Sequence, residues 1–245
     1  MIPRPAAYRC GAARGLRYGT LPAEIEEALP RWIETRTVPE GVELKPRVLY
    51  RVKDWAVKLV PAPSGWRSFR RSPALRAAEI ARSIQPLRAP RPLVALQGRR
   101  GLRVGDGLLV AEFVEGPHLG DAWDDPAAMA AFPAFLAQCH RRGVFHGDLH
   151  PRNLLWNGVE WVLLDLESLR HGLHGVFSRR LIEGQWSRIY RNMSEYREVL
   201  EPRAHEIFER YLTAAGLDWN AKRTWSRIVA QAERKAEVKR ARRGL

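Results

Sequence analysis

The sequence contains little cysteine, no long apolar run and few acidic residues. Of its 245 residues only two are cysteines, Cys10 and Cys139, too few for a disulfide framework or a cysteine-based zinc site. The longest apolar runs, such as 108–111, are far shorter than the roughly 18 residues that a membrane-spanning helix needs. The opening residues 1–5 also lack the apolar segment of a signal peptide. We therefore expect a protein of the reducing cytoplasm.

The shortage of acidic residues leaves a strongly basic chain. There are 27 Asp and Glu against 41 Lys and Arg, a formal net charge of +14 with neutral histidines. Such an excess predicts an anionic partner: nucleic acid, acidic lipid or a phosphorylated substrate. Residues 222–243 include nine Lys or Arg but only two Glu. Half of the chain's excess positive charge therefore lies near the C-terminus. We expect this region to bind the anionic inner face of a membrane, at roughly 1 kcal/mol per nearby cation, and nucleic acid is the alternative partner.

The sequence has ample apolar and aromatic residues. Hydrophobic residues make up 45% of the chain and nine are Trp, which excludes a solvated coil and supports a large core. The strand-like runs are 47–52, 55–60, 93–96 and 108–114, and the helical stretches are 21–36, 73–84 and 124–142, followed by basic helices after Asp165. We expect an α+β chain with a poorly ordered leader over 1–20, a lobe of antiparallel sheet plus one helix over 21–115, and a mainly helical lobe over 116–245.

One segment concentrates polar chemistry between the helix that ends near Arg142 and the clearest hairpin of the sequence. It reads His-Gly-Asp-Leu-His-Pro-Arg-Asn over 146–153. The hairpin turns at Asn157-Gly158, the preferred type I′ pair, and its second strand ends at Asp165. A tight hairpin returns the chain to its start, so Asp148, Asn153 and Asp165 can meet at one edge. Two carboxylates and an amide oxygen are what phosphoryl transfer with Mg²⁺ requires.

This segment resembles the protein-kinase-like superfamily in its His-x-Asp-x-x-x-x-Asn form. The resemblance implies a bilobal protein-kinase-like fold, with ATP and Mg²⁺ as cofactors. It also implies that Asp148 is the catalytic base or orients the attacking hydroxyl, and that Asn153 and Asp165 are the magnesium ligands. His146 would pack behind the loop as a structural residue. A metal-hydrolase site built on His146, Asp148 and His150 is the other interpretation, but no further histidine cluster supports it.

The upstream lobe carries weaker signals in the same order. Trp55-Ala56-Val57-Lys58 stands where kinases place the strand lysine that contacts the α- and β-phosphates, and Glu79 is the helix glutamate that would hold Lys58. The run 108–114 resembles the last strand of the lobe and the hinge. The resemblance thus assigns Lys58 and Glu79 to catalysis. Lys58 and backbone groups near Glu112, Phe113 and Val114 would bind the nucleotide.

The sequence departs from protein kinases in ways that favour a smaller acceptor. No Gly-x-Gly-x-x-Gly precedes Lys58, Gly147 replaces the arginine of regulated kinases, and Leu166-Glu167 replaces Phe-Gly after the metal aspartate. No Ala-Pro-Glu segment follows. The arrangement is most similar to bacterial lipopolysaccharide core kinases, which phosphorylate Kdo or heptose at the cytoplasmic membrane face. This implies a kinase peripheral to the inner membrane that acts on a sugar or glycolipid.

Two other functions stay open at this stage. An atypical RIO-like protein kinase or an aminoglycoside-type small-molecule kinase would use the same residues on another acceptor, although antibiotic acceptors are cationic and suit an acidic pocket. A pseudokinase or nucleic-acid adaptor would explain the missing glycines. The presence of Lys58, Asp148, Asn153 and Asp165 together argues against that last alternative.

Overall fold

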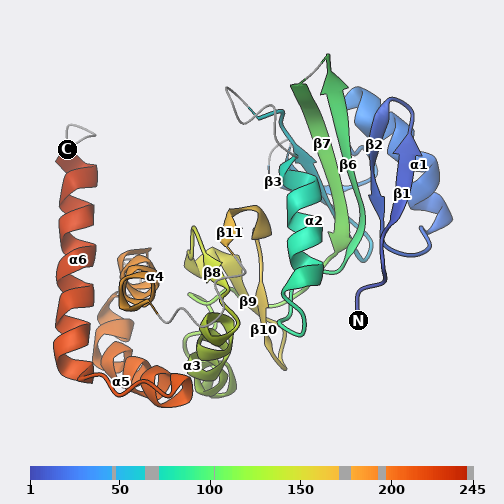
Figure 1. Cartoon of the computed structure of the whole chain (residues 1–245). Helices are drawn as coiled ribbons and strands as arrows, with labels where there is room; N and C mark the ends of the chain where they lie inside the picture. The colour runs from blue at the N-terminus through green and yellow to red at the C-terminus, as the bar shows by residue number, and fades with distance from the viewer. Residues whose placement is uncertain (46–47, 64–71, 102, 171–177, 193–196, 242–245) are drawn as a thin grey trace. The chain divides into compact units, whose positions relative to one another are not determined.

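The computed structural model describes residues 1–45, 48–63, 72–101, 103–170, 178–192 and 197–241. The chain divides into two compact units, Met1–Val114 and Glu115–Leu245, and the division lies one residue from the boundary expected from the sequence. Figure 1 traces the elements of both units along the chain. None of the helices within the described ranges combines the length and apolar character that a membrane crossing requires.

The first unit is built on one antiparallel sheet of seven strands in the order β1-β2-β6-β7-β5-β4-β3. The strands are β1 (Ala6–Cys10), β2 (Ala13–Arg17), β3 (Val42–Lys45), β4 (Leu49–Val52), β5 (Trp55–Val60), β6 (Pro92–Arg100) and β7 (Arg103–Glu112). The helices are α1 (Ala23–Thr35) and α2 (Pro73–Ser83). The strands predicted on either side of Lys53-Asp54 are confirmed as β4 and β5. The strands predicted at 93–96 and 108–114 are confirmed as parts of β6 and β7. Within its described residues the unit holds two helices, where the lobe was expected to hold one.

The two helices cover opposite faces of this sheet (Figure 1). The α1 face holds the main core, where Ile25, Leu29 and Trp32 pack with alternate sheet residues such as Val57 and Val110. On the other face a Cβ added at Gly107 would lie 3.0 Å from Ser72 Oγ and 3.3 Å from the Ala74 side chain, at the start of α2. Because strand side chains alternate, each strand position can be assigned to the α1 or the α2 face.

The leader predicted over 1–20 is wrong, because β1 and β2 form a hairpin that extends the sheet beside β6. The stretch is rich in Ala, Gly and Arg and has no strand pattern of its own. Its pairing depends on tertiary contacts: Cys10 and Ala13 are buried, and at Gly15 a Cβ would lie 1.8 Å from the Ala95 carbonyl oxygen. Only glycine lets β2 approach β6 this closely, so packing overrides local propensity.

The second unit is mainly helical around two short strand pairs. The helices are α3 (Pro126–Arg141), α4 (Arg179–Asn192), α5 (Arg197–Ala215) and α6 (Ala221–Ala241), with 3₁₀ turns η2 (Pro151–Asn153) and η3 (Leu166–Ser168). The strands are β8 (Phe145–His146), β9 (Leu154–Trp156), β10 (Trp161–Leu163) and β11 (Leu169–Arg170). The predicted hairpin around Asn157-Gly158 is confirmed as β9–β10. The α+β class, a sheet followed by a helical part, is confirmed as well.

Aromatic rings hold the helices of the second unit together. The Trp186 ring on α4 lies 6.1 Å from that of Phe132 on α3, 5.2 Å from those of Phe208 and Tyr211 on α5, and 6.2 Å from that of Trp225 on α6, all edge-on. Trp186, Phe132, Phe208 and Tyr211 are nearly fully buried. Edge-to-face pairs at these distances add to the stability from apolar burial. Helix α4 is therefore fixed against the rest of the unit, which matters because it carries residues that contact the loop at 146–153.

Candidate active site

His146 is the organising residue of the 146–153 loop. It ends β8, it is buried, and its Nδ1 accepts a hydrogen bond of 3.2 Å from the Asp148 N–H. Its Nε2 lies 2.9 Å from the Leu164 carbonyl oxygen, to which it donates when Nδ1 is the acceptor. Burial lowers the pKa of His146 despite the hydrogen bond to Leu164 and the nearby charges of Asp165 and Asp148. His146 is thus a neutral, buried side chain that links the loop to the end of the hairpin by hydrogen bonds. This agrees with the structural role expected of it behind the loop.

Asp148 and Asn153 are tied together by the loop itself. The Asn153 Nδ2 donates 2.8 Å to the Asp148 carbonyl oxygen, which also accepts from the His150 N–H at 2.8 Å. His150 caps η2 by accepting from the Arg152 N–H through Nδ1. The Asp148 side chain is exposed, and within the described part of the chain the Asn153 Oδ1 has no hydrogen-bond partner. A carboxylate and an amide oxygen are therefore both available to ligands.

Asp165 joins the same network from the end of the hairpin. The Leu164 N–H donates 2.9 Å to the Asn153 carbonyl oxygen, so the residue before Asp165 is bonded to both Asn153 and His146. Asp165 is exposed and left-handed, with φ 54° and ψ 50°, a conformation that Asp tolerates better than most residues. Hydrogen bonds thus link the segments that carry Asp148, Asn153 and Asp165 through His146 and Leu164.

Gly147 leaves no room for a side chain. Its N–H donates 3.0 Å to the Ser168 carbonyl oxygen, and a Cβ at this position would lie 2.3 Å from that same oxygen. The contact belongs to the pairing of β8 with β11, in which His146 lies opposite Leu169. The glycine that replaces the arginine of regulated kinases is therefore required by close backbone packing beside Asp148.

Two residues of α4 that the sequence did not single out hold the loop through the backbone of His146. The buried Gln185 amide accepts from the His146 N–H at 3.3 Å and donates to the His146 carbonyl oxygen, and Arg188 NH1 donates to that oxygen at 3.3 Å. The sequence did carry a signal for Gln185. It lies on the buried stripe of α4 with Ile182, Trp186 and Ile189, where a polar side chain needs a partner.

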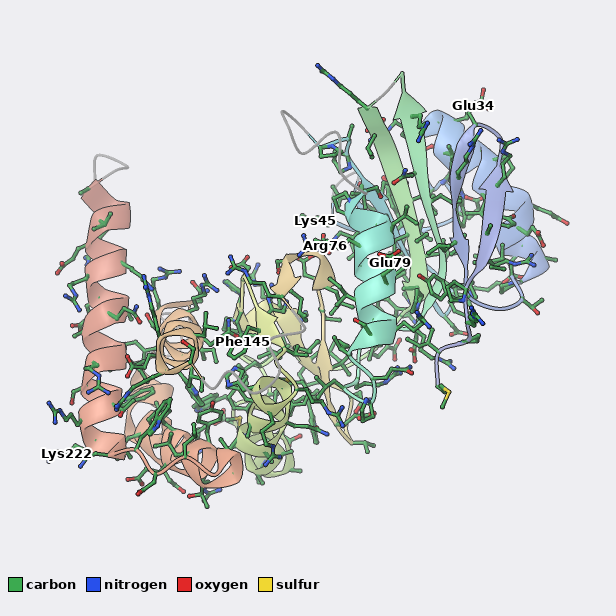
Figure 2. All side chains as sticks on the ribbon, viewed as in Figure 1. Glu34, Lys45, Arg76, Glu79, Phe145 and Lys222 are labelled. Carbon is green, nitrogen blue, oxygen red and sulfur yellow. The ribbon has the colours of Figure 1, made fainter. Side chains whose placement is uncertain are left out.

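Lys58 and Glu79 belong to the first unit, on β5 and α2. Lys58 pairs in register with Leu109, two residues from Gly107 on β7, and strand alternation therefore places it on the α2 face. Glu79 is partly buried on α2 (Figure 2) and its charge helps raise the pKa of the buried Tyr18 to about 12, behind the larger effect of burial. Both Lys58 and Glu79 have polar or electrostatic interactions within the structure.

Residues 112–114, which were expected to contact adenine, already form some hydrogen bonds within the first unit. The N–H groups of Glu112 and Phe113 donate to the carbonyl oxygens of Arg91 and Asp54 at 2.9 and 2.8 Å. The Glu112 carboxylate binds Arg88; burial alone would raise its pKa, but hydrogen bonds from Arg88 and the Arg91 backbone lower it below the usual value. Among the described residues the Val114 N–H has no partner, so it is the donor that this segment offers to a ligand.

The donor set suits a magnesium ion better than a transition metal. Among the described residues no group of three or more His, Cys, Asp or Glu side chains could hold a metal on its own. Mg²⁺ needs only one or two protein oxygens when nucleotide phosphates and water complete its shell. The Asn153 Oδ1 and the Asp165 carboxylate meet that requirement. The metal-hydrolase interpretation gains no support, because His146 is committed to Leu164 and Asp148 through both ring nitrogens.

Comparison with known proteins agrees with this chemistry. The sequence model of the phosphotransferase enzyme family matches residues 76–174, a range that contains Glu79, 112–114, Asp148, Asn153 and Asp165. No curated protein sequence matches the chain. The protein-kinase-like fold and a kinase activity follow from this match together with the kinase-type loop.

Solved structures that match the chain include those of WaaP and WbdD. WaaP, solved in complex with acyl carrier protein, is 15% identical over 96% of this chain and 88% of its own, with a TM-score of 0.49. WbdD, solved with a kinase inhibitor, is 19% identical over 80% of this chain and 45% of its own, with a TM-score of 0.47. A further WbdD structure, described as a bifunctional kinase-methyltransferase, is 16% identical over 77% of this chain and 42% of its own, with a TM-score of 0.43. The chain thus spans less than half of WbdD.

Proposed function

The chain is a phosphotransferase with a protein-kinase-like fold, and from that premise we propose that it transfers the γ-phosphoryl group of ATP to a sugar hydroxyl of the lipopolysaccharide inner core, on Kdo or heptose. The observation that supports the transfer chemistry is the hydrogen-bonded network around His146, which links the segments that carry Asp148, Asn153 and Asp165. Phosphoryl transfer depends mainly on positioning and charge stabilisation, which such a rigid loop supplies.

Each proposed role follows from an available atom. The exposed Asp148 carboxylate orients the acceptor hydroxyl and accepts its proton as the oxygen attacks. The Asn153 Oδ1 and the Asp165 carboxylate hold Mg²⁺, which neutralises charge on the nucleotide phosphates when bound. In the first unit Lys58 contacts the α- and β-phosphates, Glu79 holds Lys58 in place, and the Val114 N–H donates to adenine.

The acceptor assignment rests on the sequence and on charge. The chain lacks the Phe-Gly and Ala-Pro-Glu segments of protein kinases, and its Gly147 cannot be replaced by the arginine that reads a phosphorylated activation loop. Helix α6, which begins next to Lys222 in Figure 2, carries much of the positive charge of the C-terminal region. A basic helix of this kind suits an enzyme that works on a glycolipid at the anionic inner membrane face.

The test is transfer to a defined acceptor. Purified wild-type protein with γ-labelled ATP and Mg²⁺ should phosphorylate delipidated inner-core oligosaccharide, and mass spectrometry should find one added phosphate on Kdo or heptose. The source strain carrying only the Asp148→Asn protein should lack that phosphate in its lipopolysaccharide. Label on protein or on an aminoglycoside, with none on the oligosaccharide, would contradict the acceptor assignment and leave the kinase chemistry in place.

A further inference from the structure

Several basic residues lie close to Arg188, which contacts the loop two residues from Asp148. Arg188 and Arg191 lie one turn apart on α4 and so share a face, and α4 packs against α6, which carries Lys235. Arg170 belongs to β11, paired in register with Phe145 of β8, the strand that leads into the loop. Arg188 NH1 reaches the His146 carbonyl oxygen at 3.3 Å, two residues from Asp148. We refer to Arg188, Arg191 and Lys235 as the cationic cluster.

These charges act on one another and on Asp148. Burial lowers the pKa of the half-buried Arg188 guanidinium; Asp148 opposes that shift, and Arg191 and Arg170 add to it. Burial also lowers the pKa of Lys235, and repulsion from Arg188 and Arg191 lowers it further. All members of the cationic cluster are therefore within electrostatic reach of a neighbouring cation. Asp148 is the only carboxylate that acts on Arg188 in these interactions.

Among the residues that the structure describes, no carboxylate forms an ion pair with a member of the cationic cluster. The same two helices do pair other cations: Glu183 on α4 binds Arg179 at 3.0 Å and Arg227 of α6 at 2.8 Å. Within the described part of the chain, α4 and α6 thus pair Arg179 and Arg227 with a carboxylate, but no ion pair is formed by Arg188, Arg191 or Lys235. Like charges held together in this way cost stability unless an anion joins them.

We propose that Arg188, Arg191 and Lys235 form an acceptor subsite that binds a carboxylate or phosphate group carried by the substrate beside the hydroxyl to be phosphorylated. The proposal rests on the proposed function, because it takes Asp148 as the group that orients that hydroxyl. The acceptor must occupy the space next to Asp148, so its other substituents meet whatever side chains lie around Asp148. Arginine and lysine there select an anionic sugar.

The subsite narrows the substrate class. An acidic sugar, or a sugar that already carries phosphate, supplies the anion that the cationic cluster lacks. A cationic acceptor such as an aminoglycoside would add positive charge to unneutralised cations and bind poorly. A neutral sugar would gain nothing from the cluster. The acceptor is therefore anionic close to the reacting hydroxyl.

The test compares substitutions inside and outside the cationic cluster. Arg191→Gln and Lys235→Gln each remove one cluster charge, while Arg180→Gln on α4 and Arg234→Gln on α6 remove the same charge from exposed positions on the same helices. The acceptor is soluble Kdo-containing oligosaccharide, compared with the same oligosaccharide after reduction of its carboxylates to alcohols. Because neither acceptor carries lipid, membrane binding does not contribute.

We expect each cluster variant to raise KM for the acidic oligosaccharide roughly tenfold, with kcat and the KM for ATP close to wild type. The control variants should match wild type. With the carboxyl-reduced acceptor the cluster variants and wild type should have equal KM values. Unchanged KM in the cluster variants, an increase in the KM for ATP instead, or an equal loss with the reduced acceptor would each overturn the subsite.

A second measurement separates this inference from the proposed function. If wild-type protein transfers no phosphate to the oligosaccharide, the proposed function fails, and the subsite is then tested by binding alone. Titration of Kdo methyl glycoside into the full chain with Mg·ADP should give calorimetric binding that the cluster variants lose and the control variants keep. Equal binding by all variants, or binding by none, would overturn the subsite.

Discussion

The Asn153 amide nitrogen donates a hydrogen bond of 2.8 Å to the backbone carbonyl oxygen of Asp148. This bond fixes which end of the amide faces the loop, so the Oδ1 atom of Asn153 points to the side left for a ligand. The same carbonyl also accepts from the His150 N–H. One side chain therefore shapes the loop and offers a metal ligand, and the two roles can be separated by substitution.

Substitutions of Asn153 should divide those two roles. Asn153→Asp keeps an oxygen for Mg²⁺ but cannot donate to the Asp148 carbonyl, whereas Asn153→Ala removes both the donor and the ligand. We expect both variants to lose about 1 kcal/mol of unfolding free energy with the lost hydrogen bond. Only Asn153→Ala should raise the Mg²⁺ concentration needed for half-maximal transfer by tenfold or so. An Asn153→Ala enzyme with wild-type Mg²⁺ dependence would contradict the metal assignment.

Gly147→Ala should damage the loop severely. Its new methyl group would lie 2.3 Å from the Ser168 carbonyl oxygen, so β8 and β11 must separate or the loop must move. We expect activity to fall by roughly two orders of magnitude or more, because displacement by about 1 Å at a catalytic group has that effect.

A second glycine supplies the matched control. Gly184 lies in α4, where an added Cβ meets nothing within 4 Å. Gly184→Ala should leave activity unchanged and stabilise the protein by up to about 1 kcal/mol through helix propensity. Thermal unfolding and phosphoryl-transfer rates of both variants test the importance of the close contact at Gly147. An active, stable Gly147→Ala protein would show that this contact does not restrict the loop.

We expect the protein to lose stability in acid because His140 is buried in its neutral form. It is buried on α3, its Nδ1 lies 2.7 Å from the Tyr211 Oη, and its ring stacks on Phe145 at 4.8 Å. Burial lowers the pKa of His140 to about 3, from an ordinary value of 6.5. Between these two values the unfolded chain binds the proton and the folded protein does not, so stability is full above pH 6.5 and falls as the pH drops.

The expected size follows from linkage. Lowering the pH from 7.5 to 5.5 should cost about 1.4 kcal/mol through His140 alone. Urea unfolding at several pH values gives the slope, and in His140→Gln the mean slope over this range should correspond to about half a proton fewer. Burial also lowers the pKa of His146, so a smaller slope of the same sign should persist in that variant. Identical slopes in variant and wild type would contradict the buried neutral state of His140.

Local patterns in the sequence were enough to predict the elements around the site. Alternating apolar residues placed β5 and the β9–β10 hairpin, and Asn157-Gly158 defined its turn. Asp125 and Pro126 marked the start of α3, where the Asp125 carboxylate accepts from the Ala127 N–H. These features depend on neighbouring residues and on backbone geometry, so they can be read from a single sequence.

Features that depend on distant residues were not predictable in the same way. The β1–β2 hairpin exists because Gly15 fits against the Ala95 carbonyl oxygen, a contact across 80 positions of the chain. The support that Gln185 and Arg188 give to His146 depends on where α4 packs. The cationic cluster joins α4 and α6 in the same way. The basic excess is visible in the sequence, but which described cations pair with a carboxylate depends on how the helices pack.

The most direct test of the account is phosphoryl transfer by Asp148→Asn protein. The substitution keeps the backbone carbonyl that Asn153 and His150 contact, so the loop should stay folded. Transfer from ATP to inner-core oligosaccharide should fall roughly 10²- to 10⁴-fold, the usual contribution of a positioned base, while Mg²⁺-dependent ATP binding stays within a few-fold of wild type. An Asp148→Asn enzyme that transfers phosphate at the wild-type rate would contradict the account.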